Sequence, residues 1–413
     1  MSRSSIALSN LRGVVIVIVL AFHSVLAYLA SLPIAPYAFD VAPYRWQATP
    51  IIDSQRWFGF DLFCAWQDVS LMSLMYLLSG LFVPASLARK GSRTFLSDRL
   101  LRIGVPLVLV VAMLMPIAYY PAYRVTAVDP SIEAYWQHWL ALPFWPPGPQ
   151  WFLWELLALN VLAAALHRLA PQWHKGLSRW MATAGADPVR FFITLVAASA
   201  LAYVPLELMF SPWAWENYGP FSVQLCRPLH YLVYFFAGYL IGARGLDRGL
   251  LNCDGLLARR WAAWLVAAPV GFVLWALPTS QMLDGRQAPI LVQFASGLGF
   301  AIACAAGGLS FLAMSLRFAS VRTRMLDSLA ANAYSMYLIH YVFVVWLQFA
   351  MLPLALFAIG KAAIVFAGTL ALSWAASIAL GNVLAGEQFA QIKRWLRASV
   401  GEPEAAALIK QDD

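Results

Sequence analysis

Two histidines lie inside long apolar segments, where ionisable side chains are costly and are the first candidates for function. Ten uncharged residues separate Arg12 from His23, and His340 ends the segment Tyr334-Ser-Met-Tyr-Leu-Ile-His340. At about 100° per residue, the eleven-residue step returns a helix almost to the same face, so Arg12 and His23 project together. The two histidines are expected at one depth in different helices, which indicates a polar cavity. Each can equally form a structural hydrogen bond to a neighbouring helix.

Arginine side chains form a second group with possible chemistry. The pattern Arg99-Leu-Leu-Arg102 places two guanidinium groups on one helix face, and this forked donor surface suits phosphates. Basic residues near a membrane also serve simply as anchors, and Arg12 has the same two interpretations. Arg227 and His230, at the start of a later apolar segment, either belong to a substrate vestibule or extend toward the membrane interface.

An acidic and aromatic cluster opens the apolar segment that begins at Trp151. Glu155 falls about one turn inside that segment, where a carboxylate can bind acceptor hydroxyl groups or satisfy the helix N-terminus. Trp151 and Trp154 follow the Trp- and Pro-rich stretch 122–150, and these rings can stack on sugars or form an interfacial belt. From the residues alone both interpretations stay open, and the belt is the more common of the two.

The composition restricts the class of protein that carries these residues. Of 413 residues, 62% are hydrophobic and only 12% are charged, which excludes a soluble enzyme, a disordered chain and a nucleic-acid-binding domain. The net charge of +8 is typical of basic residues that anchor cytoplasmic loops. The four cysteines lack a CxxC spacing, so they predict neither a metal site nor a disulfide framework.

Apolar segments of about 20 residues, the length needed to cross a bilayer, recur along the chain. They are continuous rather than alternating, which excludes an outer-membrane barrel. The fold class predicted is an all-α polytopic membrane protein. We predict about ten transmembrane helices, at 11–31, 66–88, 104–121, 151–167, 191–210, 225–243, 261–277, 290–314, 330–350 and 353–384.

The distribution of basic residues sets the orientation of these helices. With the N-terminus inside, 22 of the 28 Lys and Arg residues fall in inside segments, as the positive-inside rule requires. Both termini are therefore predicted to be cytoplasmic, with Arg12 at the inner edge and His23 near the midplane. Residues 1–386 form one transmembrane domain in this prediction. Residues 387–413 form a basic amphipathic helix on the inner leaflet and a short tail.

Several short motifs occur in a fixed order along the chain. Together they resemble the acyltransferase-3 family of bacterial inner-membrane acyltransferases over nearly the whole length, with a layout similar to the glucan-succinylating branch. Some family members carry an appended hydrolase-like domain, which is not found here. The motifs are Leu11-Arg12-Gly13 with His23, Leu77-Leu-Ser79-Gly80, Phe95-Leu-Ser-Asp-Arg99-Leu-Leu-Arg102 with Pro106, Gly148-Pro149-Gln150-Trp151-Phe152-Leu153, and Tyr337-Leu-Ile-His340.

The resemblance implies O-acylation of an extracytoplasmic carbohydrate in the bacterial inner membrane. The donor implied is a cytoplasmic acyl-CoA that acts as co-substrate, with an acyl group of the acetyl or succinyl class and no bound cofactor. Arg12, Arg99 and Arg102 would then hold the donor phosphates. His23 would act at the thioester as base or nucleophile, with His340 in support. Glu155, Trp151 and Trp154 are the predicted acceptor-binding residues.

Two other classes of function are considered. A secondary transporter or an exporter of a glycan or lipid-linked sugar would also place midplane histidines behind a basic inner mouth. Transporters commonly show inverted repeats and paired broken helices, and neither is evident in this sequence. A membrane scaffold without enzymatic activity would leave His23 and His340 without a purpose.

Overall fold

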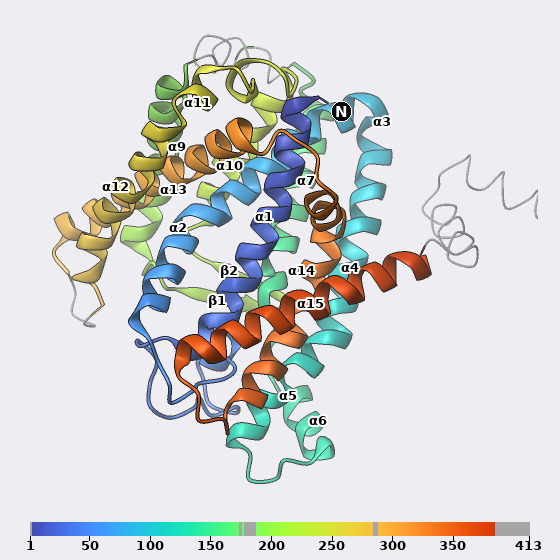
Figure 1. Cartoon of the computed structure of the whole chain (residues 1–413), viewed down its shortest axis with the longest axis vertical. Coiled ribbons are helices and arrows are strands. Elements are labelled where there is room, and N and C mark those ends of the chain that lie inside the picture. Colours follow the sequence, from blue (N-terminus) through green and yellow to red (C-terminus); the bar gives the residue numbers. More distant parts are fainter. Residues whose placement is uncertain (1, 173–175, 177–186, 284–287, 385–413) are drawn as a thin grey trace, which may run out of the picture.

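The long apolar runs form helices, because only a helix satisfies its own backbone polar groups in hydrocarbon. The computed structural model describes residues 2–172, 176, 187–283 and 288–384. In these residues nine helical stretches are long and apolar enough to cross a membrane, and the shorter apolar helix Pro228–Gly242 makes a tenth. The prediction of an all-α polytopic membrane protein is confirmed (Figure 1). The predicted tail at 387–413 lies outside the described residues.

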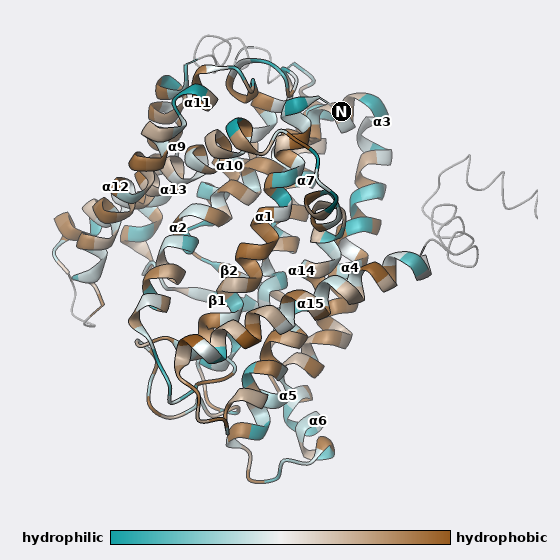
Figure 2. Ribbon diagram, viewed as in Figure 1, coloured by the Kyte–Doolittle hydropathy of each residue, from teal (hydrophilic) through white to brown (hydrophobic). Residues whose placement is uncertain are grey.

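Most of the described chain is helical, with one small hairpin (Figures 1 and 2). The helices are α1 (Arg3–Val25), α2 (Phe58–Leu81), α3 (Val83–Arg99), α4 (Val105–Leu109), α5 (Met115–Thr126), α6 (Ile132–Leu140), α7 (Trp151–Leu169), α9 (Pro188–Met209), α10 (Pro228–Gly242), α11 (Leu256–Arg259), α12 (Trp261–Ser280), α13 (Ile290–Phe318), α14 (Arg324–Met351) and α15 (Ala358–Leu384). The strands are β1 (Trp215–Tyr218) and β2 (Phe221–Gln224).

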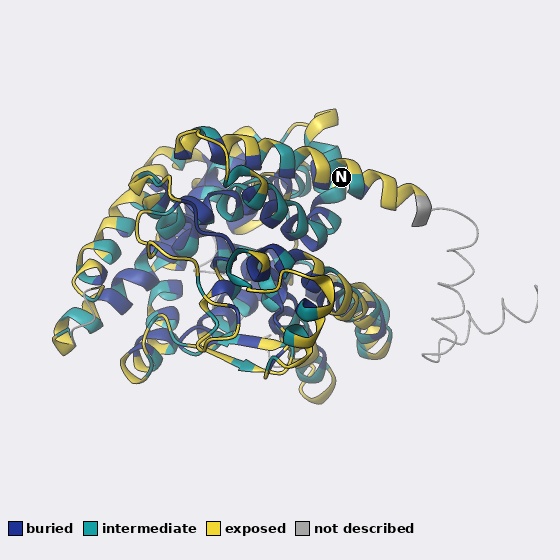
Figure 3. Cartoon of the chain, turned by 90° about the horizontal axis from the view of Figure 1, so that it is seen from below, coloured by how far each residue is buried: buried dark blue, intermediate teal, exposed yellow. Residues whose placement is uncertain are grey.

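Helix α1 lies at the centre of the helix assembly and positions both Arg12 and His23. It packs against α2, α13, α14 and α15 (Figure 1). Buried residues gather in the interior of the assembly, whereas outer helices such as α12 carry exposed apolar side chains (Figure 3). In a membrane-spanning protein such side chains face lipid, so the outer helices need no polar surface.

Glycines allow α2 and α10 to cross with their backbones in contact. A Cβ atom on Gly80, Gly238 or Gly242 would lie about 2 Å from a backbone carbonyl oxygen of the other helix. Gly238 and Gly242 form the small-xxx-small spacing that permits such crossings in membranes. The predicted span 66–88 was placed too late, because α2 ends at Leu81 and the chain turns at Phe82. This crossing fixes the inner end of α2, where Ser79 lies.

The chain from Ser92 in α3 to the end of α5 is helical and includes two π-helical turns, and a kink at Gly91 (φ 72°) separates it from the first part of α3. The first π-turn, Leu100–Gly104, follows Arg99 and contains Arg102. Pro106 has no N–H with which to bond the Arg102 carbonyl four residues earlier, and Tyr334 donates its hydroxyl to that carbonyl instead (2.6 Å). The π-turn and this contact fix the backbone that carries the two arginines.

A β-hairpin between α9 and α10 was not predicted from the sequence. β1 and β2 are antiparallel, with Trp215 opposite Gln224 and Tyr218 opposite Phe221. Gly219 in the turn has φ 59°, and its carbonyl accepts a hydrogen bond from the Trp145 backbone N–H (2.9 Å). The strands are only four residues long, too short to stand out in a chain of apolar segments.

The long connection between α1 and α2 is fixed by a buried ion pair. Lys361 at the start of α15 donates to Asp53 (2.7 Å), and both side chains are only 1% exposed. Lys361 falls within the predicted span 353–384, and only the packing shows that it is buried against Asp53. The predicted last span 353–384 begins instead at Ala358, after the turn that brings Lys361 to Asp53.

Candidate active site

The two predicted histidines are in direct contact, although 317 residues separate them in the chain. His340 Nε2 lies 3.3 Å from His23 Nδ1, and the ring centroids are 4.9 Å apart. α1 and α14 run in the same direction, since Gly13 also packs against Ala330. The prediction that His23 and His340 share one depth is therefore confirmed.

Backbone carbonyls determine where the protons of the two rings lie. His23 Nδ1 is 2.9 Å from the Val19 carbonyl oxygen, and His340 Nδ1 is 2.7 Å from that of Tyr337. A carbonyl oxygen only accepts hydrogen bonds, so both Nδ1 atoms carry a proton. In the neutral rings, His340 Nε2 then accepts from His23 Nδ1–H. His23 Nε2 keeps a lone pair, and no described residue forms a hydrogen bond with it.

A cavity of about 480 Å³ leads from Arg12 toward this histidine pair. It lies between α1, α2, α7, α14 and the stretch that includes Arg99 and Arg102, and all three predicted arginines line it. The Arg99 guanidinium also lies over the Phe95 ring (4.9 Å). Arg12 is shared with a neighbouring cavity of about 360 Å³ that Arg322 also lines. The structure thus brings together three guanidinium groups that the sequence places in two separate segments.

The far end of the cavity is apolar apart from the Tyr337 hydroxyl, which donates to the Pro149 carbonyl. On each helix the lining residues furthest from the Arg12 level are Val19, Met75, Phe152 with Leu153, and Tyr337. Neither histidine lines the cavity itself. Val19 precedes His23 by one helical turn, and the Tyr337 ring centroid is 5.8 Å from that of His340. The cavity therefore ends one helical turn short of the histidine pair.

The predicted acceptor residues lie on the other side of Phe152. Glu155 is buried and accepts a hydrogen bond from the Tyr76 hydroxyl (2.6 Å), while its Oε1 has no hydrogen-bond partner among the described residues. Trp154 donates its indole N–H to the Ser222 carbonyl (2.9 Å). The Trp151 ring meets that of Trp215 edge to face. The hairpin thus packs directly against the start of α7.

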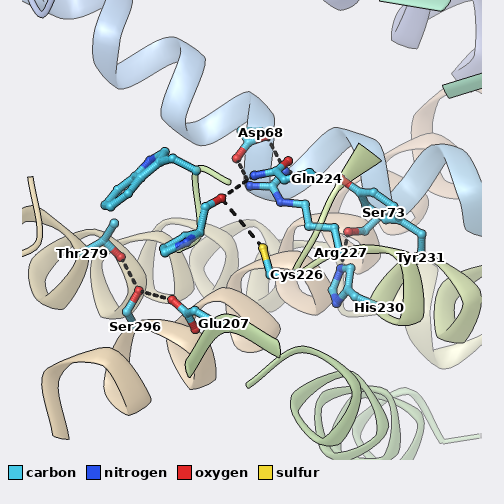
Figure 4. Close-up of polar contacts among 12 residues, drawn as sticks. Asp68, Ser73, Glu207, Gln224, Cys226, Arg227, His230, Tyr231, Thr279 and Ser296 are labelled. Carbon is cyan, nitrogen blue, oxygen red and sulfur yellow. Dashed lines mark hydrogen bonds and ion pairs between the residues drawn. The ribbon is translucent and has the colours of Figure 1, made fainter. Parts of the chain in front are cut away.

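The interfacial interpretation of Arg227 and His230 is wrong, because both side chains are buried (Figure 4). Arg227 forms two hydrogen bonds with Asp68 (2.6 and 2.5 Å). His230 contacts Ser73 through Nε2 (2.8 Å) and Ser199 through Nδ1 (2.7 Å). These two serines satisfy both ring nitrogens.

Some site residues were given no role from the sequence. Tyr76 became relevant only through its contact with Glu155. Gln150, which is fully buried, donates to the Leu338 carbonyl (3.3 Å) beside the histidine pair. Tyr341 packs edge to face on His23, with ring centroids 5.6 Å apart. Tyr76 and Tyr341 are two of 16 tyrosines, so residue type alone does not separate them from the others, and Gln150 belongs to a motif that assigns it no role. Among the described residues no group of three or more His, Cys, Asp or Glu is placed to hold a metal.

Comparison with known protein families identifies the type of chemistry. The acyltransferase-3 family model, described as an acyltransferase domain, matches residues 5–378. The chain belongs to this family. No curated protein and no solved structure matched it. The protein is therefore a multi-pass membrane acyltransferase, and the family assignment favours this class over the transporter alternative.

Proposed function

We propose that this acyltransferase moves an acyl group of the acetyl or succinyl class from cytoplasmic acyl-CoA to a hydroxyl of an extracytoplasmic carbohydrate, in the bacterial inner membrane. The observation that carries the proposal is the cavity that joins Arg12, Arg99 and Arg102 to an apolar end one turn from His23. Guanidinium groups suit the donor phosphates. The helical distance from Arg12 to His23, about 16 Å, is comparable to the length of a pantetheine arm.

In this proposal His23 is the general base. Its Nε2 takes the proton of the acceptor hydroxyl as that oxygen attacks the thioester carbonyl carbon. The new C–O bond forms, the C–S bond breaks, and the CoA thiolate takes the proton back from Nε2. His340 accepts from His23 Nδ1–H, which holds the ring in the tautomer that leaves Nε2 basic. A covalent acyl-histidine would use the same nitrogen as a nucleophile.

Glu155 and the tryptophans at the start of α7 are proposed to hold the acceptor. The unpaired Oε1 of Glu155 supports a role for this carboxylate in binding a hydroxyl group, because a buried acceptor atom without a partner is unfavourable. Access for a glycan would then be from the side of the β-hairpin. In this proposal the donor and the acceptor bind on opposite sides of the Phe152 side chain.

The test compares the periplasmic and surface glycans of a gene-deletion strain with those of strains that express the wild-type protein or the His23→Ala variant. Ester-linked groups are released with mild alkali, and acetate and succinate are quantified. We expect one ester type that depends on the wild-type gene and is absent with His23→Ala at equal protein abundance. Identical glycan esters in all strains would overturn the proposal. Glycans that are esterified but retained in the cytoplasm would indicate an exporter.

A further inference from the structure

We propose that Ser79 and Asn160 bind the two amide N–H groups of the pantetheine arm. Both residues line the cavity of about 480 Å³ that also contains Arg12, Arg99 and Arg102, which we call the donor cavity. This inference rests on the proposed acyl-CoA donor and names the part of the donor that the lining residues bind. Four uncharged residues with polar side chains line the cavity: Ser79, Asn160, Tyr334 and Tyr337. The hydrogen bonds that these side chains already make determine what they still offer to a ligand.

The three hydroxyl groups have each used their only proton. Ser79 donates to the Met75 carbonyl (2.8 Å), Tyr334 donates to the Arg102 carbonyl (2.6 Å), and Tyr337 donates to the Pro149 carbonyl. A backbone carbonyl cannot donate in return, so these bonds have one direction only. What each hydroxyl still offers a ligand is an oxygen lone pair. A ligand that pairs with them must bring hydrogen-bond donors.

Asn160 adds an acceptor of the same kind. Its side chain is almost completely buried, and its Nδ2 donates to the Leu156 carbonyl (2.7 Å), which fixes which amide atom is the nitrogen. The opposite atom, Oδ1, is buried and has no hydrogen-bond partner among the described residues. Because an unpaired buried acceptor is unfavourable, an N–H donor from a bound ligand would be favoured here.

The positions along the cavity match the spacing of amides in pantetheine. Ser79 lies four residues, about one helical turn, from Met75 at the apolar end, and Asn160 lies eight residues, about two turns, from Phe152. In the arm, the two amide nitrogens follow the sulfur in sequence and lie about 5 Å apart by standard bond lengths. With the sulfur at the apolar end, the nearer amide meets Ser79 and the farther amide meets Asn160. An acyl phosphate has no N–H to fill these positions.

The experiment measures binding of CoA to the purified protein in lipid nanodiscs, so it needs neither an acyl group nor an acceptor. Two CoA analogues are used, each with one amide N–H replaced by an ester oxygen. We expect each analogue to bind the wild-type protein about 5- to 10-fold more weakly than CoA. Asn160→Leu should bind CoA more weakly by a similar factor and no longer distinguish CoA from the analogue altered at the farther amide. Ser79→Ala should do the same for the nearer amide.

Matched control variants separate recognition from folding. Asn10 is also buried, donates through Nδ2 to the backbone and has an unpaired Oδ1, but it does not line the cavity. Ser315 likewise donates to a backbone carbonyl away from the cavity (2.7 Å). Asn10→Leu and Ser315→Ala should keep the full distinction between CoA and both analogues. Equal weakening of CoA and both analogues in the Ser79 and Asn160 variants would overturn the inference alone. No CoA binding by the wild-type protein would overturn the proposed donor as well.

Discussion

His230 and His23 both lie inside the helix assembly, but their ring nitrogens are paired differently. His230 is enclosed by α2, α9 and α10 and has a serine on each ring nitrogen, Ser73 and Ser199. His23 is held by a carbonyl and by His340 on the same nitrogen, Nδ1, so its Nε2 keeps an unused lone pair. Both rings lie among aromatic side chains. Burial inside the helix assembly therefore does not by itself mark a reactive group. In the proposed function, the unpaired Nε2 distinguishes His23 from His230.

The neighbourhoods of the two histidines also differ in their access to a cavity. Near His230, Arg227 pairs with Asp68, and Glu207 accepts from Ser296, which also contacts Thr279 (Figure 4). Arg227 Nε and Glu207 Oε2 have no hydrogen-bond partner among the described residues, but neither side chain lines the cavity. The cavity below His23 instead presents guanidinium groups to its interior. The polar groups that a ligand can reach are therefore those that line the cavity.

The strongest test of this comparison is the removal of each imidazole. His23→Ala should lower acyl transfer by about 10²–10⁴-fold, because a general base contributes that much to the rate. Transfer is measured as radiolabel moved from acyl-CoA to glycan by purified protein in nanodiscs. Thermal unfolding should stay close to that of the wild-type protein. Substantial remaining transfer would remove His23 from the catalytic role.

His340→Ala should have a smaller effect, about 10- to 100-fold on the rate, since His340 acts through the orientation of His23. Donor and acceptor affinities should change little, because His340 does not line the cavity. The same transfer assay, with both substrate concentrations varied, separates these quantities. A loss as large as that of His23→Ala would give His340 an equal part in the chemistry.

The next largest effect is expected from substitution of the guanidinium groups that line the donor cavity. The double variant Arg99→Lys and Arg102→Lys retains the positive charge but loses the planar fork, so donor affinity should fall about 10-fold while topology and acceptor dependence survive. Binding of CoA to the purified protein measures this directly. The matched control is Arg317→Lys, on α13 outside the cavity lining. Unchanged CoA binding by the double variant would assign Arg99 and Arg102 to membrane anchoring.

Glu155→Gln tests the acceptor side. The variant keeps the size of the side chain and its bond with Tyr76 but removes the charge, so apparent acceptor affinity should fall about 3- to 10-fold with donor binding intact. Both dependences are measured on the same preparation. Equal losses for donor and acceptor would indicate a folding defect, and no loss would end the proposed acceptor role.

The smallest effect on activity is expected at His230. His230→Ala removes the partners of two buried serines and should lower stability by about 1–3 kcal/mol. Transfer per folded molecule should remain within about twofold of the wild-type rate. Thermal unfolding in nanodiscs and the transfer assay measure the two quantities separately. A loss of transfer without a loss of stability would contradict the distinction between the two histidines.

The sequence by itself determined the helical class of the fold and the residues worth testing. Hydropathy and helical period are local properties, so they predicted the apolar segments and the face that Arg12 shares with His23. They also selected His340 as a partner at equal depth. The same reasoning misplaced the second span and missed the four-residue strands, because short turns and strands carry little periodic signal.

Only the tertiary structure decided which polar groups meet. The contact of His23 with His340, the burial of Arg227 against Asp68 and the pairing of Lys361 with Asp53 join residues more than 150 positions apart. Such contacts depend on how whole helices pack, for example on the close α2–α10 crossing at Gly80. The ring nitrogen that remains free is set by carbonyls and hydroxyls from several helices. No pattern within one helix contains that information.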